Sequence, residues 1–80
     1  MSQHRNSSYD ADYIAIIERL IERRKELGLS QEELAVAFHQ NQSFISRVER
    51  RRRRIDVLEY VQLCRLLDLD PGDELKALGL

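Results

Sequence analysis

The chain has 80 residues, 42% of them hydrophobic and 34% charged, a composition that excludes disorder throughout and allows one small domain with a modest core. Its formal net charge is −1. This charge is unevenly distributed, because residues 42–54 contain six arginines and one glutamate, a local charge of +5, and the other residues together carry −6. A ligand responds to the local field, so the near-neutral total does not exclude a nucleic-acid partner.

Cysteine usage and hydropathy indicate the compartment. Cys64 is the only cysteine, so an internal disulfide and a cysteine-based zinc site are excluded, and a reducing environment fits. No apolar run approaches the roughly 18 residues of a membrane span, and the polar N-terminus does not resemble a signal peptide. We therefore expect a soluble, cytoplasmic protein without a membrane partner.

The N-terminal residues 1–10 are polar and lack periodicity, which predicts a mobile tail ahead of a single domain over residues 11–80. His4 and Arg5 leave open an arm that enters a DNA minor groove, as arms of some DNA-binding domains do. A frayed end is the favoured interpretation of this stretch.

A first helix is predicted over residues 11–27, ended by Gly28. Apolar residues recur on one side of it at helical spacing, namely Tyr13, Ile17, Leu20 and Ile21. Arg24 falls in the middle of this side, where a charge is costly unless it is paired and hydrogen-bonded. We therefore expect a buried carboxylate beside Arg24.

Two short helices joined by a three-residue polar turn are predicted over residues 31–50. Ser30 and Glu33 form a capping box at the start of the first helix, and Asn41 caps the second. The second helix has an apolar stripe only two residues wide, Ile45 and Val48, so most of its surface is expected to be exposed.

The outward side of this second helix carries hydrogen-bond donors and no carboxylate; its side chains are Gln42, Ser43, Ser46, Arg47 and Arg50. Glutamine and arginine match the edges of adenine and guanine bidentately in the DNA major groove, which admits one helix. This face therefore indicates DNA. Phe44 borders the stripe, and both packing and contact with a thymine methyl stay open for it.

The segments LSQEELAVAF and QSFISRVER resemble the helix-turn-helix of the phage Cro and repressor type, the XRE family, over about Ile21 to Leu69. The resemblance implies a compact, all-α, five-helix domain of the lambda-repressor-like type with its helix-turn-helix at residues 31–50. It also implies base contacts by the polar face, namely Gln42, Ser43, Ser46 and Arg47, with Ser46 the least strongly implied.

Four positions depart from the family's pattern. His39 and Gln40 stand in the turn where glycine and an apolar residue are usual, and histidine tolerates a positive φ better than a branched residue, so we expect a strained turn. Arg51 stands at the usual glycine after the second helix, and Ile55 at the usual proline of the next loop. These two changes predict that the second helix runs further than normal.

Glu49 is the expected partner of Arg24. It lies beside Ile45 and Val48 on the inner side of its helix, so it is a misplaced charge of the opposite sign, and the resemblance implies that the two positions pair. The alternative is that Arg24 extends along its apolar stem and places its guanidinium in solvent.

Arg50 to Arg54 form a run of five arginines. Such a run is often a solvated face or a localisation signal, but directly after a recognition helix it is placed to clamp DNA phosphates by forked hydrogen bonds. At Gln31 the side-chain amide and the helix N-terminus offer a further phosphate contact. The predicted phosphate-binding set is Gln31, Asn41, Arg50, Arg51, Arg52 and Arg53.

The C-terminal third predicts two more helices. Asp56 and Glu59 open a fourth helix that is apolar around most of its circumference, so it is central or lies partly in a dimer interface. Asp70 and Pro71 open a short fifth helix through about Leu78. The leucines near the end are expected to pack on the domain or on a second copy of the chain.

The favoured function is a sequence-specific transcriptional regulator, a repressor of bacterial or phage origin, that binds a palindromic operator as a homodimer. The alternative is a protein-interaction module, such as an antitoxin that binds a partner protein. An enzyme is not expected, because His4 and His39 are the only histidines and no nucleophile motif or glycine-rich phosphate loop occurs. No cofactor or metal is expected.

Overall fold

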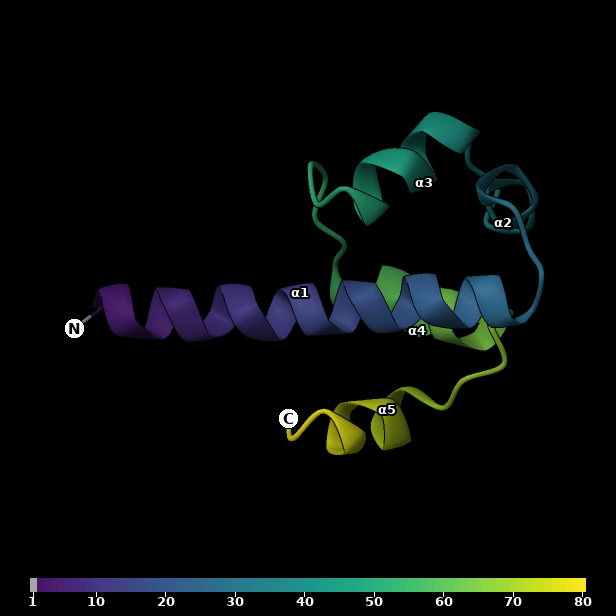
Figure 1. Ribbon diagram of the computed structural model, residues 1–80. Helices are drawn as coiled ribbons and strands as arrows, with labels where there is room; N and C mark the ends of the chain where they lie inside the picture. Colours follow the sequence, from purple (N-terminus) through teal and green to yellow (C-terminus); the bar gives the residue numbers. More distant parts are fainter. Residues whose placement is uncertain (1) are drawn as a thin grey trace.

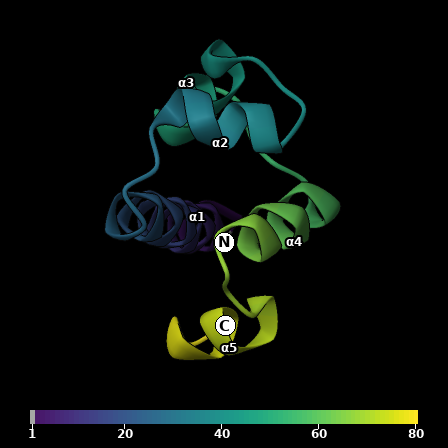
Figure 2. The ribbon, with the colours of Figure 1, turned by 90° about the vertical axis from the view of Figure 1, so that its right-hand side faces the viewer.

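The computed structural model describes the backbone of residues 2–80 and the side chains of residues 10–80. This part of the chain is all-helical, with no strands, and confirms the predicted five-helix fold. The helices are α1 (Ser2–Glu26), α2 (Gln31–Ala37), α3 (Gln42–Glu49), α4 (Val57–Leu66) and α5 (Pro71–Ala77). They form three layers: α2 and α3 cover one side of the adjacent α1 and α4, and α5 lies on the other side (Figures 1 and 2).

Helix α1 begins at Ser2, well before the predicted start at residue 11. Most of the stretch predicted as a tail is therefore helical. Its mobility stays a prediction, and the arm proposed for His4 and Arg5 lies outside the side chains that the structure describes.

All four predicted N-caps are present. The Ser30 hydroxyl accepts from the Glu33 amide at 3.0 Å, and the Glu33 carboxylate accepts from the Ser30 amide at 2.8 Å. Asp56 and Glu59 form the same reciprocal box at the start of α4. The remaining two caps are Asn41 before α3 and Asp70 before α5, where Pro71 occupies the first turn. Each cap satisfies backbone donors that a helix start leaves unpaired.

Each helix ends with a residue in the left-handed region, and three of these residues are not glycine. His39, Arg51 and Asp68 have φ of 60°, 60° and 58°. After each of them an amide reaches back to a carbonyl of the preceding helix, as from Gln40 to Ala35 at 2.8 Å and from Arg52 to Arg47 at 2.8 Å. This pattern is the Schellman motif, which satisfies the last carbonyls of a helix.

The prediction that the second helix of the helix-turn-helix, α3, runs further than normal is therefore wrong. Helix α3 ends at Glu49 because the hydrogen bonds of the Schellman motif outweigh the cost of the left-handed conformation at Arg51. Isoleucine at position 55 also has a local role, since its backbone amide donates to the Tyr13 hydroxyl at 3.2 Å. Proline has no N–H to make this bond.

The core lies where α1, α2, α3 and α4 meet; its buried residues are Ile17, Leu20, Leu34, Ala35, Phe44, Ile45, Val48, Leu63, Cys64 and Leu67. Phe44 is 6% exposed and packs on Phe38 with ring centroids 5.8 Å apart. The predicted two-residue stripe of α3 is thus three residues wide, and Phe44 belongs to the core. Cys64 is fully buried, and burial raises the pKa of its thiol, which favours the neutral form.

Helix α5 has no buried residue, and a hydrogen-bonded ion pair connects it to α1. The Arg19 guanidinium of α1 donates to the Glu74 carboxylate of α5 at 2.7 Å, whereas Arg23 of α1 donates to the carbonyl of Leu67, at the end of α4, at 3.0 Å. Nothing in the sequence pattern distinguishes these two arginines from their neighbours. Leu75 and Leu78 are half-buried, and Leu80 remains 51% exposed.

The turn at His39 gives a stability prediction. Replacing His39 with glycine should raise the free energy of unfolding by up to about 1.5 kcal/mol, because an L-residue with positive φ costs roughly 1–2 kcal/mol and the extra backbone entropy of glycine costs roughly 0.5–1 kcal/mol. His39→Val should lower it, since a branched side chain is worse in this region. Urea unfolding of both variants measures the difference. Gly28→Ala is the control. Gly28 has φ of +71°, and nothing lies within 4 Å of the added Cβ, so this variant should lose stability through backbone conformation and not through a steric clash.

Candidate nucleic-acid interface

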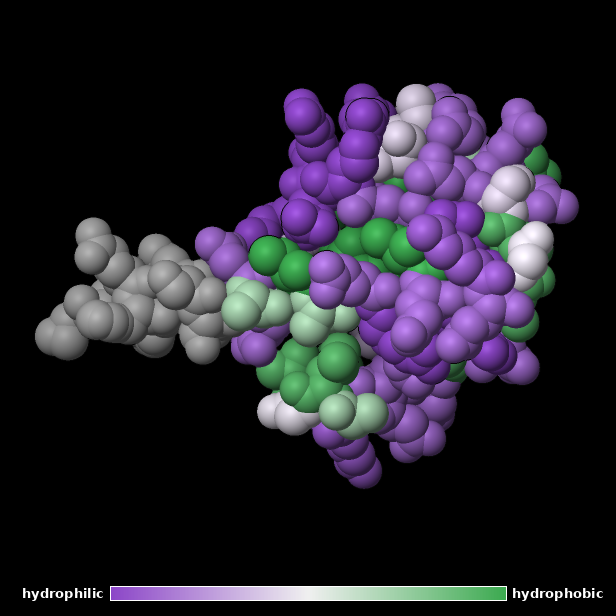
Figure 3. Space-filling view, viewed as in Figure 1, coloured by the Kyte–Doolittle hydropathy of each residue, from purple (hydrophilic) through white to green (hydrophobic). Residues whose placement is uncertain are grey.

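Helix α3 divides sharply into a buried and an exposed side. Its buried residues are Phe44, Ile45 and Val48. Of the residues predicted to project outward, Ser46 is half-buried and the others are exposed; these are Gln42, Ser43, Arg47 and Arg50. The helix lies at one edge of the molecule, and strongly hydrophilic side chains project over it and over the loop that follows (Figures 1 and 3). The structure therefore presents the whole predicted base-reading set on or near one surface.

An ion pair lies beneath this surface, between Arg24 of α1 and Glu49 at the end of α3. The guanidinium donates two hydrogen bonds to the carboxylate, from Nε to Oε2 at 2.7 Å and from Nη2 to Oε1 at 3.0 Å. Its remaining Nη1 donates to the Leu29 carbonyl at 2.7 Å. Both side chains are only about a tenth exposed, at 10% and 11%. The alternative in which Arg24 reaches solvent is therefore not adopted.

Gln31 links this buried pair to the exposed face. Its amide Nε2 donates to Glu49 Oε1 at 2.8 Å, and its Oε1 accepts from Nε2 of Gln42 at 2.7 Å. The sequence predicts a phosphate contact for this amide, but the structure directs both of its ends into the protein. One N–H of Gln31 is left over for such a contact, which stays a prediction.

Asn41 and Ser43 are coupled in a second small network. The Asn41 side-chain oxygen accepts from the Phe44 amide at 2.9 Å and from the Ser43 hydroxyl at 2.7 Å. The hydroxyl proton of Ser43 is thereby committed, so Ser43 meets a ligand as an acceptor. Helical periodicity does not relate side chains two residues apart, so the sequence does not predict this hydrogen bond between Ser43 and Asn41.

The arginine run divides into outward and inward members. Arg50, Arg51 and Arg52 are exposed. Arg53 instead donates to the Glu59 carboxylate at 2.6 Å and places its guanidinium 4.6 Å from the centre of the Phe44 ring. This differs from the prediction that groups Arg53 with the phosphate contacts, because a carboxylate and an aromatic face of its own domain already hold it.

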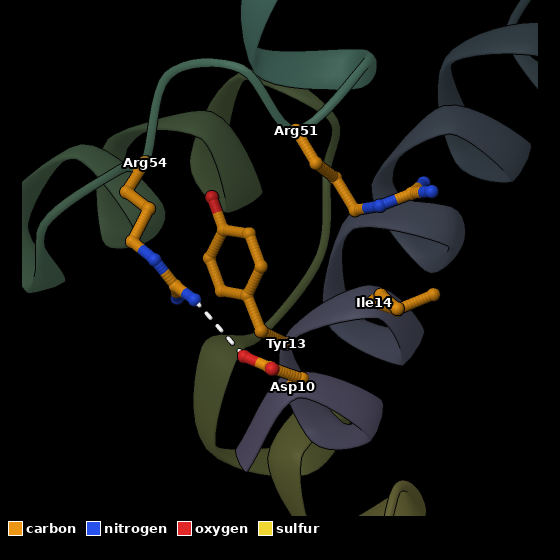
Figure 4. Close-up of a pocket in the computed structure, with 5 residues that line it drawn as sticks. All are labelled: Asp10, Tyr13, Ile14, Arg51 and Arg54. Atoms are coloured by element: carbon orange, nitrogen blue, oxygen red, sulfur yellow. Dashed lines mark hydrogen bonds and ion pairs between the residues drawn. The ribbon is translucent and has the colours of Figure 1, made fainter. Parts of the chain in front are cut away.

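Arg54 also contacts side chains of its own domain, in this case on α1. Its guanidinium pairs with Asp10 at 3.3 Å and lies 4.4 Å from the centre of the Tyr13 ring. These residues, together with Ile14 and Arg51, line a shallow pocket of about 240 Å³ (Figure 4). In Figure 4 the Arg51 side chain lies on the opposite side of the Tyr13 ring from Arg54 and extends alongside α1.

Within residues 10–80, no group of three or more histidine, cysteine, aspartate or glutamate side chains is placed to hold a metal ion. No helix in the described part of the chain is both long and apolar enough to cross a membrane.

The ion pair predicts a large stability effect. Glu49→Ala should lower the free energy of unfolding by about 3–5 kcal/mol, because it leaves the buried Arg24 guanidinium without its carboxylate. Thermal or urea unfolding measures this loss, with the exposed Glu18→Ala in α1 as the matched control. Adding Arg24→Met to Glu49→Ala should recover part of the loss. An unfolding midpoint for Glu49→Ala equal to that of the control would contradict a buried pair.

Glu59 predicts a dependence of stability on pH. The hydrogen bond from Arg53, and next the Asp56 amide, lower its pKa from the ordinary 4.5. A lowered pKa in the folded state contributes stability that is present above about pH 4.5 and is lost as the pH falls through the lowered value. Glu59→Gln should remove this contribution, so its stability should decrease less than that of the wild type on acidification below pH 4.5. Arg53→Met should remove most of the same component, since the carboxylate then loses its first partner.

Comparison with known proteins identifies a matching family and a similar solved structure. The family model described as Helix-turn-helix matches residues 20–73, close to the range over which the sequence predicts the resemblance. Among solved structures, an XRE-family like protein from Pseudomonas syringae pv. tomato str. DC3000 is similar, with 36% sequence identity and a TM-score of 0.90. The similarity covers 95% of this chain and 93% of that one. No curated protein matches.

Proposed function

We propose that this chain, which belongs to the XRE family of helix-turn-helix DNA-binding proteins, is a sequence-specific transcriptional regulator that inserts α3 into the major groove. The observation that carries the proposal is the exposed polar side of α3, which rests on a buried ion pair and is followed at once by three outward arginines. A helix that is anchored on one side and rich in donors on the other fits a groove that is read by hydrogen bonds.

Gln42 is the first base-reading residue in this proposal. One N–H of its amide is held by Gln31, so the side chain presents its Oε1 and its second N–H to a ligand in a fixed orientation. An acceptor and a donor side by side match N6 and N7 of adenine. We therefore assign an adenine to the base that Gln42 meets.

Arg47 is the second base-reading residue in this proposal. It is exposed on the same side of α3, and its planar guanidinium offers paired donors, which match O6 and N7 of guanine. Ser43 and Ser46 lie between these two long side chains and have one hydroxyl each, so they contribute smaller contacts to the same surface.

The phosphate contacts are assigned to the two ends of α3. Asn41 at its N-terminus keeps its side-chain NH₂ for a phosphate oxygen, and Gln31, which holds the neighbouring Gln42, keeps one N–H. Arg50, Arg51 and Arg52 follow the C-terminus. Such contacts fix the position of the protein on the duplex without reading its sequence.

We propose further that the protein acts in the cytoplasm of a bacterial or phage-infected cell as a homodimer on a palindromic operator. Helix-turn-helix dimers place two recognition helices one helical turn apart, so twofold symmetry in the protein is matched by the operator. Occupation of such a site represses transcription where it overlaps a promoter. Selection of binding sites from random duplex DNA tests the whole assignment and should return an inverted repeat with adenine and guanine in each half-site.

Base reading and phosphate binding should respond differently to substitution. Gln42→Ala or Arg47→Ala should cost about 1–3 kcal/mol of binding on the selected site with much less loss on random DNA, because each bidentate contact discriminates between bases by that amount. Arg52→Ala should weaken binding to both duplexes alike and lower the salt slope by roughly one unit.

The measurement is a set of binding curves on selected and random duplexes at several salt concentrations. Lys25→Ala is the control, since this exposed cation of α1 lies outside the proposed interface. Equal losses on both duplexes for the Gln42 and Arg47 variants would show that α3 does not read bases.

A further inference from the structure

The five arginines that follow α3 differ in whether a carboxylate of the protein pairs with them. Within the described residues no carboxylate pairs with the first three, whereas Arg53 pairs with Glu59 and Arg54 pairs with Asp10. Residues 1–9 contain no aspartate or glutamate, and Asp10 is the only carboxylate among the residues that line the pocket between α1 and this loop. Helix α1 thus meets the end of the arginine run through one carboxylate.

The two paired arginines are held with different strength. Arg53 donates to Glu59 at 2.6 Å, and the Phe44 ring covers its guanidinium. The hydrogen bond from Arg54 to Asp10 is longer, at 3.3 Å, and these two side chains are 67% and 64% exposed. An exposed ion pair of this kind contributes little to stability. Its effect is therefore expected in what Arg54 can bind, and not in how well the chain folds.

The backbone at Arg54 is held by contacts that do not involve Asp10. Its carbonyl accepts from Nη1 of Arg53 at 2.7 Å, and the next amide, that of Ile55, donates to the Tyr13 hydroxyl at 3.2 Å. The Arg54 side chain extends from this backbone past the Tyr13 ring to the Asp10 carboxylate (Figure 4). Asp10 therefore restrains the direction of one long side chain, while other contacts restrain the path of the loop.

A DNA phosphate and the Asp10 carboxylate compete for the same guanidinium, because arginine binds both anions with the same forked donors. A phosphate that takes Arg54 has to displace Asp10 and leaves this carboxylate unpaired beside a negatively charged backbone, where like charges repel. An arginine without a carboxylate partner binds a phosphate and releases a counterion from the DNA without that cost. The pair thus opposes a contact that the outward arginines make freely.

We propose that Asp10 withholds Arg54 from DNA phosphates and thereby lowers the affinity of the protein for duplexes of any sequence. The inference rests on the proposed function for its ligand, and it adds a residue of α1, outside the helix-turn-helix, to those that determine DNA affinity. Phosphate contacts carry no direct sequence information, so the preference for the operator over other DNA is unchanged. Each stay on a non-specific site becomes shorter, because changes in affinity act mainly on the dissociation rate.

Binding to a random duplex over a range of salt concentrations tests the proposal. Asp10→Ala should bind more tightly than the wild type and steepen the salt slope by roughly 0.9 unit, so its advantage should shrink roughly 3.5-fold between about 50 and 200 mM salt. Glu18→Ala is the matched control. It also removes one carboxylate from an exposed position of α1, but no salt bridge of the described residues involves Glu18, so this variant should keep the wild-type slope.

The double variant Asp10→Ala/Arg54→Ala separates the release of Arg54 from the change in overall charge. It replaces an ion pair of zero net charge with two neutral side chains, so it should bind the random duplex with the affinity and salt slope of the wild type. A double variant with a lower slope would show that Arg54 already contacts phosphate in the wild type, and would overturn the proposal. The same conclusion would follow from equal slopes for Asp10→Ala and Glu18→Ala.

The same measurements on the selected duplex separate this proposal from the proposed function. Asp10→Ala should tighten binding to both duplexes by the same factor. A wild type that prefers the selected duplex, with no change of slope in Asp10→Ala, would reject the role of Asp10 and keep the regulator. A steeper slope in Asp10→Ala, with no preference for any duplex, would uphold the role of Asp10 and reject sequence-specific regulation. A wild type that binds no duplex would reject both.

Discussion

The buried pair of Arg24 and Glu49 is the constraint on which the rest of this small fold depends. Two charges removed from water are tolerable only with short, well-aligned partners, and here the guanidinium has three hydrogen bonds to protein oxygens. The pair joins α1 to the last residue of α3, a helix that buries only three side chains of its own. The recognition helix is thus positioned by geometry-dependent polar contacts as much as by apolar packing, and a displacement of α3 would separate the charges.

The Glu49 carboxylate also orders side chains on the exposed side of α3. Glu49 Oε1 accepts from both Arg24 and Gln31, and Gln31 in turn holds Gln42. A side-chain amide on a helix surface normally rotates freely, and ordering it on binding has an entropic cost. In this protein much of that ordering is already present before DNA is bound. The core and the proposed base-reading face therefore form one hydrogen-bonded unit.

Much of this architecture could be predicted from the sequence, because its signals are local. Helical spacing in α1, the four caps and the two misplaced charges at positions 24 and 49 each depend on a few neighbouring residues. The failures share a different cause. Phe44 is buried by Phe38 and Arg53, the Arg53 guanidinium turns to Glu59, and α5 is held by Arg19; each of these contacts joins residues that no periodicity relates. The end of α3 differs from the prediction for another reason: the preference for glycine at a left-handed position is only about 1–2 kcal/mol, which hydrogen bonding can exceed.

The five consecutive arginines have a further electrostatic consequence, because they begin where α3 ends. The aligned peptide dipoles of a helix leave about half a negative charge at its C-terminus, and cations there are stabilised by roughly 0.3–1 kcal/mol. Arg50 caps α3, and Arg51 occupies the left-handed position that glycine would fill at lower conformational cost. The helix thus attracts the cations that its own terminus displays and offsets part of their mutual repulsion. In the complex proposed above, the exposed Arg50, Arg51 and Arg52 would therefore meet neighbouring phosphates as a group of cations whose repulsion the helix end already reduces.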